Sequence, residues 1–568
     1  MDQEGFRKAA HAVVEHIIEY NSTLSDRPVL PKIQPGYLRD LIPSNAPEQP
    51  EPWPLIQADI ESQIIPGLTH WQSPNFMAFF PALVTYPSLL GEMYSAAFTA
   101  PAFNWLCSPA CTELETIVMD WVAKALALPD CFLSTSSGGG GGVIHGSASE
   151  AIVTTMVAAR ERYLRVRADA EGLRDGTMER DDRIAFLRGR LVALSSDQAH
   201  SSTQKGALIT GTRYRSISTC LSEDLSLTAP RLEEALQQCH ADGLEPYYLT
   251  LTLGTTSTCA VDDFASIATL RSKYPNLWIH IDAAYAGAAL ILQEYQAQYS
   301  QDIGRISDSF NFNMHKWLLV NFDASCLFVQ NRNHLTRALS INPSYLQNNF
   351  TESGLVTDYR DWQIPLGRRF RALKIWFVMR SYGIEGLRMH IENSLRVGET
   401  FTAMVVERRD LFEIIATPRF ALTCLRLRPG VAVAARMKQR QVNEKMYMSG
   451  DAELPHPRSA GIASWGASDT REEQTIKVDA QSNLPGREGQ EQASETLANN
   501  LTKDIADLIN SRGEIFITPT TTARKTLIRV VSGNPVASKE HARKAFDIIV
   551  RTTEEVLDKC RQGEDLRN

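Results

Sequence analysis

Short apolar runs alternate with helical or turn-forming segments through the middle of the chain. The apolar runs lie at 191–194, 247–253, 277–281 and 326–329. Runs of this length without regular polar alternation are typical of strands that are buried on both faces. The pattern therefore predicts an α/β fold, with a mainly parallel central sheet covered by helices on both faces.

The N-terminal region carries a different pattern. Five apolar residues recur there at helical spacing and predict an amphipathic helix. They are Phe6, Ala9, Val13, Ile17 and Tyr20. Prolines then crowd residues 28–54 and favour an extended segment. A short helix and an extended arm cannot build a core of their own, so they need a surface to pack on. We expect the main body or, preferably, a second copy of the chain to provide it.

The C-terminal region predicts a small mixed domain. Strands are expected at 514–517 and 527–531, followed by a helix that begins at Ser538. Residues from about 430 to 499 are polar and rich in Gly, Ser, Gln and Glu, which predicts a partly disordered surface insertion. The expected organisation is an N-terminal helical arm at 1–85, a large α/β domain at 86–385 and a small α+β domain at 386–568 that contains the insertion.

Polar residues follow three of the predicted strands directly. His200 follows the first, Thr256 the second and Asp282 the third. In an open α/β sheet, ligands bind at the carboxyl ends of the strands. Any one of these residues alone would be interpreted as a helix cap, but together with Lys316 they indicate one site.

Lys316 lies between His315 and Trp317, and further apolar residues follow. An ammonium group in an apolar neighbourhood loses hydration, which lowers its pKa toward the range where the free amine attacks carbonyl carbon. The alternative is a lysine whose stem is buried and whose ammonium reaches water. The polar residues at the other strand ends favour the first interpretation, a lysine that forms a Schiff base.

A run of five glycines at 138–142 comes shortly before a predicted helix. Ser147 and Glu150 fit a capping box at the start of that helix. A glycine-rich approach to a helix N-terminus favours an anion such as phosphate. The spacing matches neither a Walker loop nor a dinucleotide fingerprint, so the glycines alone fit a plain turn equally well.

Composition narrows the class of protein. The chain has 568 residues, of which 43% are hydrophobic and 22% charged, as in ordinary globular proteins. Its net charge of -8 argues against a nucleic-acid partner. Nine scattered cysteines without zinc-type spacing predict reduced thiols in a cytoplasmic protein with no metal site. Neither a signal peptide nor a membrane-spanning run is predicted.

Five motifs resemble, in order, those of the group II pyridoxal-phosphate (PLP) decarboxylases, specifically the aromatic L-amino-acid decarboxylases. They are Ser195-Ser-Asp-Gln-Ala-His-Ser-Ser202, Leu253-Gly-Thr-Thr256, His280-Ile-Asp-Ala-Ala-Tyr-Ala-Gly287, Asn311-Phe-Asn-Met-His-Lys-Trp317 and Gln363-Ile-Pro-Leu-Gly-Arg-Arg-Phe-Arg371. The resemblance implies the aspartate-aminotransferase-like fold (fold type I), in which 86–385 binds PLP, and a homodimer. It also implies decarboxylation of tryptophan, 5-hydroxytryptophan, DOPA, tyrosine or phenylalanine to the arylalkylamine and CO2.

The resemblance also implies individual roles. Lys316 would bond the cofactor, Asp282 would pair with its ring nitrogen, and His200 would stack on the ring near the substrate carboxylate. Further cofactor-site residues implied are Ala148, Ser149, Thr256, Ala284, Asn313 and His315. Implied substrate residues are Trp71, Phe80, Phe103 and Gly367. Aromatic residues in the loop 70–81 would otherwise simply fill a core.

The sequence departs from the family pattern at several positions, and two functions remain as alternatives to decarboxylation. Phe79, Ala82 and Met314 replace residues common in the family, and Gly367 leans toward tryptophan-type or broad specificity. Tyr345 is either a plain surface residue or the family's acid, the position where phenylalanine accompanies aromatic aldehyde synthases. Such a synthase is one rival, and a catalytically dead, cofactor-binding scaffold is the other.

Overall fold

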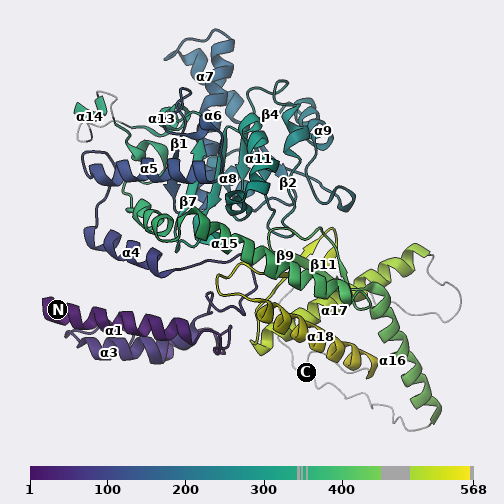
Figure 1. Ribbon diagram of the computed structural model, residues 1–568. Coiled ribbons are helices and arrows are strands. Elements are labelled where there is room, and N and C mark those ends of the chain that lie inside the picture. The colour runs from purple at the N-terminus through teal and green to yellow at the C-terminus, as the bar shows by residue number, and fades with distance from the viewer. Residues whose placement is uncertain (342–345, 347–348, 353–355, 450–486, 563–568) are drawn as a thin grey trace, which may run out of the picture.

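The computed structural model describes residues 1–568 apart from 342–345, 347–348, 353–355, 450–486 and 563–568 (Figure 1). Two sheets organise these residues: a seven-stranded sheet within 141–329 and a four-stranded sheet within 412–531. Within the described ranges, no helix is both long enough and apolar enough to cross a bilayer.

The seven-stranded sheet has the order β1-β7-β6-β5-β4-β2-β3. Its strands are β1 Gly141–His145, β2 Leu191–Ser196, β3 Arg213–Ile217, β4 Glu245–Thr252, β5 Trp278–Asp282, β6 Ser309–Asn313 and β7 Ser325–Val329. Every neighbouring pair from β3 to β6 is parallel, whereas β7 is antiparallel to β1 and β6. The predicted mainly parallel α/β fold is confirmed. Edge strand β3 escaped prediction because its sequence is polar and only its last residue is buried.

Consecutive strand residues enter two different hydrophobic cores. On β7, Leu327 and Val329 belong to one core and Cys326 and Phe328 to the other. Because side chains alternate across a strand, the sheet is buried on both faces. The first core is covered by α6 Ala148–Ala170, α7 Met178–Arg188, α8 Ser202–Thr210 and α13 Asn333–Leu339. The second is covered by α5 Pro109–Ala125, α9 Ala229–Ala241, α10 Phe264–Ala268, α11 Gln293–Ile306 and the first half of α15 Arg371–Glu407.

The N-terminal residues form an arm beside the main body (Figure 1). Its helices are α1 Gln3–Ser22, α2 Tyr37–Leu41 and α3 Trp53–Asp59, and α4 Tyr86–Phe98 then packs on α15. The predicted amphipathic helix is present, but Phe6 on its apolar stripe is 66% exposed and only Ala9 is fully buried. Ile18 and Leu55 are exposed as well. The arm thus leaves apolar side chains uncovered within the single chain.

The small sheet has the order β10-β11-β9-β8 and packs against the C-terminal helices. Its strands are β8 Phe412–Ile414, β9 Leu422–Leu427, β10 Thr518–Thr522 and β11 Lys525–Val531, and the last helix is α18 Lys539–Gln562. The strand predicted at 514–517 is wrong, because β10 begins only at Thr518. Phe516 instead bonds to the loop of Asn75 and Met77, with its N–H and carbonyl each making one backbone hydrogen bond.

The predicted surface insertion at about 430–499 is corrected at both ends. Residues there continue into helices α16 Pro429–Ser449 and α17 Arg487–Arg512. Ala432, Ala435 and Ala498 are buried in the C-terminal core. Alanine supplies these buried positions at close helix contacts, so few large apolar residues mark them in the sequence. The part of the predicted disorder at 450–486 lies outside the described residues.

Candidate active site

Sheet register brings the predicted site residues to one edge. His145 on β1 and Asn313 on β6 both pair with Ser325 on β7, so the ends of these three strands lie side by side. Asp282, the last residue of β5, is placed between β6 and β4 by the same register. The segments that follow β1, β5 and β6 therefore start from a common edge, as expected for a ligand site in an α/β sheet.

Lys316 occupies α12, one helical turn at Met314–Trp317 directly after β6. His315 and Trp317 on either side are buried, while part of the Lys316 side chain stays exposed. Removal of water by the surrounding protein lowers the pKa of the Lys316 amine, the charge of Asp282 raises it, and that of Arg529 lowers it. The net lowering favours the unprotonated, nucleophilic amine.

Three aromatic rings stack beside this amine. The centroids of Phe80 and Tyr285 are 3.9 Å apart, and those of Tyr285 and Trp317 are 4.7 Å apart. Lys316 Nζ lies 5.3 Å from the Phe80 centroid. The Tyr285 hydroxyl donates to the carbonyl of Phe420 at 2.8 Å, which anchors the stack to the loop before β9. Phe80, a predicted substrate residue, is thus placed at the amine.

Asp282 is 5% exposed, and its Oδ1 accepts from the Ala284 N–H at 2.9 Å. The Ala284 carbonyl in turn accepts from the Asn313 N–H at 3.0 Å. Behind Asp282, burial lowers the pKa of His280 to about 4, so that imidazole is neutral at neutral pH. Neutral His280 leaves the Asp282 carboxylate available to pair with a cationic ring nitrogen.

His200 lies in the loop between β2 and α8, with an oriented ring. The Ser202 N–H donates to His200 Nδ1 at 3.1 Å. Because Nδ1 accepts, the proton of the neutral imidazole sits on Nε2. Desolvation lowers the pKa of His200, Asp282 raises it and Lys316 lowers it. His200 thus lies within electrostatic reach of both Asp282 and Lys316.

The glycine-rich approach leads into α6 with the predicted cap. Ser147 Oγ accepts from the Glu150 N–H at 3.2 Å, while Glu150 Oε2 accepts from the Gly146 N–H at 2.9 Å. Ala148 and Ser149 open the helix, so their N–H groups point out of its N-terminus. A helix start with free N–H groups at this sheet edge can hold a phosphate.

Arg529 is a site residue that the sequence interpretation missed. It belongs to β11, is 3% exposed, and its guanidinium carbon lies 5.2 Å from the Phe80 centroid. Its Nε donates to the Ser257 carbonyl at 2.9 Å. Its Nη2 has no hydrogen-bond partner among the described residues. A charged residue inside the apolar run 527–531 was the available signal, because a buried arginine requires a partner.

Comparison with known proteins agrees with this geometry. Residues 35–428 match the pyridoxal-dependent decarboxylase conserved domain. The chain belongs to the pyridoxal-dependent decarboxylases. The family predicted from the motifs is therefore confirmed, and with it PLP as the cofactor.

Relatives of this decarboxylase carry two kinds of name. It is 44% identical to the aromatic-L-amino-acid decarboxylase of Rattus norvegicus over 78% of this chain and 89% of the relative. It is also 37% identical to the phenylacetaldehyde synthase of Arabidopsis thaliana over 98% of both chains. A rice (Oryza sativa) TDC structure with PLP and tryptamine superposes with a TM-score of 0.81 at 32% identity, over 98% of this chain and 99% of that one.

The residues of the decarboxylase fit PLP. Lys316 offers a desolvated amine, Asp282 a buried carboxylate, and α6 a helix N-terminus. Buried polar atoms without a hydrogen-bond partner in the described chain surround the same edge. They include Thr252 Oγ1, Asn313 Oδ1, Ser325 Oγ and Arg529 Nη2. Orphaned buried polar atoms are costly unless a ligand satisfies them, so their gathering here supports a polar occupant.

Four predicted residues lie in other surroundings. Thr256 is exposed in the loop after β4, and the Trp71 ring lies tilted against that of Phe76, with centroids 4.4 Å apart. The Phe103 carbonyl accepts a hydrogen bond from the Arg360 N–H. Gly367 lines a separate cavity of about 460 Å³ with the end of α4, where an added Cβ would meet nothing within 4 Å. Nothing in the described chain links Phe103 or Gly367 directly to Lys316.

His315, Tyr345 and the three departures from the family pattern are the remaining positions singled out in the sequence. His315 is buried, and its Nδ1 accepts from the Ala324 N–H at 2.8 Å. Of the departures, Phe79 is 46% exposed with a left-handed φ of 50°, and Met314 is fully buried. Gln72 Nε2 donates to the carbonyl of Ala82. Tyr345 lies outside the described residues.

Proposed function

We propose that this protein is an aromatic L-amino-acid decarboxylase, which converts its substrate to the arylalkylamine and CO2 with PLP. The observation that carries the proposal is the convergence of Lys316, Asp282 and His200 at one sheet edge of a confirmed pyridoxal-dependent decarboxylase. A scaffold without activity has no need of all three groups. The names of the relatives support the aromatic substrate class.

In this proposal the site residues divide the task of holding PLP. Lys316 would bond its aldehyde carbon, Asp282 would pair with its ring nitrogen, and Ala284 would pack on the ring. The α6 N-terminus would hold the phosphate together with Ala148, Ser149, Asn313 and His315, and Thr256 would be a further cofactor-site residue. When bound, PLP supplies an electron sink for the electron pair that remains at Cα when CO2 leaves.

The protein's own groups orient the substrate. His200 presents its Nε2–H, because Nδ1 is occupied by Ser202. Arg529 offers an unpaired Nη2 with a positive charge close to Lys316. Both are suited to a carboxylate, and a buried guanidinium holds one strongly. Fixing the carboxylate fixes which bond at Cα is broken, and this positioning accounts for much of the rate gain.

Aromatic side chains support a flat substrate ring. Phe80 lies at the Lys316 amine, and Trp71 and Phe79 stack at 5.7 Å in the same loop. Gly367 leaves open space where a side chain would reduce the room for an indole. We therefore favour tryptophan-type substrates, with Trp71, Phe80, Phe103 and Gly367 as the substrate residues.

A homodimer in the cytoplasm completes the proposal. The exposed apolar residues of the N-terminal arm, such as Phe6, Ile18 and Leu55, need a covering surface. Gly367 lines a cavity apart from Lys316 in the same chain, which we expect a second copy to complete. All nine cysteines are free thiols, as expected in a reducing compartment.

Aromatic aldehyde synthase is the second candidate function. The Arabidopsis phenylacetaldehyde synthase matches 98% of this chain, a larger share than the mammalian decarboxylases cover. The experiment is to incubate the PLP-loaded protein with each aromatic amino acid and to identify the product by mass, with peroxide measured in parallel. Amine without peroxide supports the decarboxylase. Arylacetaldehyde with ammonia and peroxide supports the synthase, and no product from any substrate supports the inactive scaffold.

A further inference from the structure

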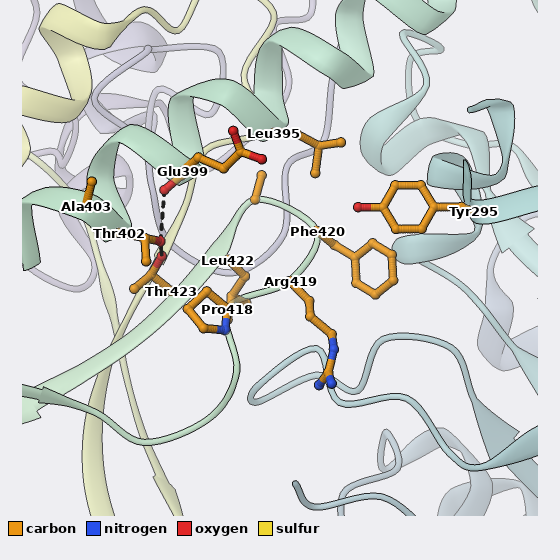
Figure 2. A pocket seen from close by; sticks show the side chains of 12 residues that line it. Tyr295, Leu395, Glu399, Thr402, Ala403, Pro418, Arg419, Phe420, Leu422 and Thr423 are labelled. Carbon is orange, nitrogen blue, oxygen red and sulfur yellow. Dashed lines mark hydrogen bonds between the residues drawn. The ribbon is translucent and has the colours of Figure 1, made fainter. Parts of the chain in front are cut away.

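A second cavity of about 410 Å³ is lined by Phe420, the residue whose carbonyl accepts from Tyr285 of the aromatic stack. It lies between α11, α15 and residues 418–423, and we call it the α15 cavity (Figure 2). Its volume is within the range of about 300–1,000 Å³ typical of small-molecule sites. None of the residues assigned to PLP or to the substrate lines it.

One wall of the α15 cavity is aromatic. The ring centroids of Tyr295 and Phe420 are 5.3 Å apart, with their planes tilted by 39°. Figure 2 shows the Tyr295 hydroxyl pointing across the cavity toward the α15 side. Burial raises the pKa of Tyr295 to about 12, with added contributions from nearby acidic groups including Glu399. The neutral hydroxyl can therefore hydrogen bond to an occupant, while the rings contact its apolar part.

Two charged residues line the α15 cavity, Arg419 and the exposed Glu399, and the acidic one is left without an ion pair among the described residues. Arg419 is paired with Asp224 at 2.5 Å, so its positive charge is already matched. Glu399 lies on the α15 side and has no ion pair or hydrogen bond from its carboxylate within the described chain. The hydroxyl oxygens of Thr402 and Thr423 lie 2.8 Å apart and form a hydrogen bond with each other. An occupant with an ammonium group would pair with Glu399 and gain cation–π attraction from the rings.

The α15 cavity is linked to the Lys316 site by one hydrogen bond. The carbonyl that accepts from Tyr285 belongs to Phe420, whose ring lines the cavity. Phe420 and Ala421 both have left-handed backbone conformations, with φ of 51° and 58°. Such conformations are strained for residues with a side chain and persist only because the surroundings hold them. An occupant that shifts this turn would move Tyr285 and the rings stacked on it.

We propose that the α15 cavity binds a primary arylalkylamine, and that its occupation lowers turnover at the Lys316 site through the Tyr285–Phe420 bond. The ligand class follows from the aromatic wall, the unpaired carboxylate and the volume. If the enzyme produces arylalkylamines, this binding is feedback inhibition by its own type of product. That interpretation rests on the proposed function. Binding of an amine in the α15 cavity does not depend on the proposed function. The binding proposal and the proposed function can therefore fail separately.

Binding is tested on the PLP-loaded enzyme after borohydride reduction, which fixes the cofactor on Lys316 and prevents amines from bonding to it. Calorimetry with 2-phenylethylamine measures the remaining binding, and 2-phenylethanol is the uncharged comparison. Glu399→Gln should weaken amine binding about fivefold and leave binding of the alcohol unchanged. Glu392→Gln, an exposed acid on the same helix outside the cavity, is the matched control. Ala403→Trp, at an exposed position of the cavity lining, should abolish binding of both compounds.

Coupling is tested on the unreduced enzyme. In the natural protein the amine should lower kcat as well as compete with substrate, whereas in Glu399→Gln and Ala403→Trp only competition should remain. The proposal is overturned if the reduced enzyme binds no 2-phenylethylamine, or if Glu399→Gln and Glu392→Gln bind it equally. A protein that binds the amine in the α15 cavity but decarboxylates nothing would refute the proposed function and leave the binding site standing.

Discussion

The guanidinium of Arg529 lies over the ring of Phe80, with its carbon 5.2 Å from the ring centroid. One residue comes from the C-terminal sheet and the other from the loop that follows the N-terminal arm. The C-terminal region thus contributes a charged group directly to the surroundings of Lys316, which makes Arg529 the first residue to test.

Replacing Arg529 by methionine should lower kcat/KM about tenfold or more, because the substrate carboxylate loses a charged donor. Arg529→Lys should recover part of the loss, since it keeps the charge. Steady-state kinetics that determine KM and kcat separately check this. The midpoint of thermal unfolding shows whether the variants remain folded. Lys525→Met is the control for the effect of replacing a basic residue elsewhere on β11. If Arg529→Met keeps natural kinetics, Arg529 does not orient the substrate.

Lys316→Ala should abolish both turnover and the visible absorbance of the bonded cofactor, because it removes the amine that forms that bond. Asp282→Ala should retain absorbance but lose most turnover, since the ring nitrogen loses its carboxylate partner. Absorbance spectra and product assays of the two proteins check this, with exposed Lys205→Ala as the lysine control. Normal turnover in either variant would refute the site assignment.

Tyr345→Phe should change the product as well as the rate. A positioned acid typically contributes ~10²–10⁴-fold to a proton transfer, and the resemblance makes Tyr345 the group that protonates Cα after CO2 leaves. Without its hydroxyl, oxygen should compete for the electrons, giving mainly arylacetaldehyde, ammonia and peroxide. Mass spectrometry with a peroxide assay checks this. Amine at the natural rate without peroxide would show that Tyr345 is not the acid.

Glu150 should contribute to stability in a defined pH window. Burial alone raises the pKa of Glu150, but the His145 imidazole, with Nδ1 3.3 Å from Oε1, and the hydrogen bond from the Gly146 N–H lower it to about 2, against an ordinary value of 4.5. Because the folded-state pKa is the lower one, this stabilisation is fully present above about pH 4.5 and is lost as the pH falls toward 2.

Urea unfolding at pH 6 and pH 3 checks the Glu150 prediction. Between these pH values the natural protein should lose about 1–2 kcal/mol more free energy of unfolding than Glu150→Gln does. Glu161→Gln, further along the same helix, should follow the natural protein. Equal losses in Glu150→Gln and the natural protein would contradict the prediction.

The sequence by itself determined the family, the sheet type and the order of the site motifs. Unbroken apolar runs such as 326–329 identify strands covered on both faces, because such strands need no polar alternation. Asp282 and His200 could be predicted because each follows a predicted apolar strand, and parallel strands end at a common edge. Lys316 could be predicted because apolar residues flank it. Ser147 and Glu150 were predictable because helix capping depends only on neighbouring residues.

Only the tertiary structure decided what depends on contacts between distant segments. Arg529 joins Phe80 across more than four hundred residues of sequence, and no local pattern gives that pairing. Ala432 and Ala498 look like insertion residues until α16 and α17 bury them, because alanine signals burial weakly. The α15 cavity and its link through Tyr285 to Phe420 arise where α11, α15 and the β9 approach meet, since a cavity is the space that packed elements leave between them.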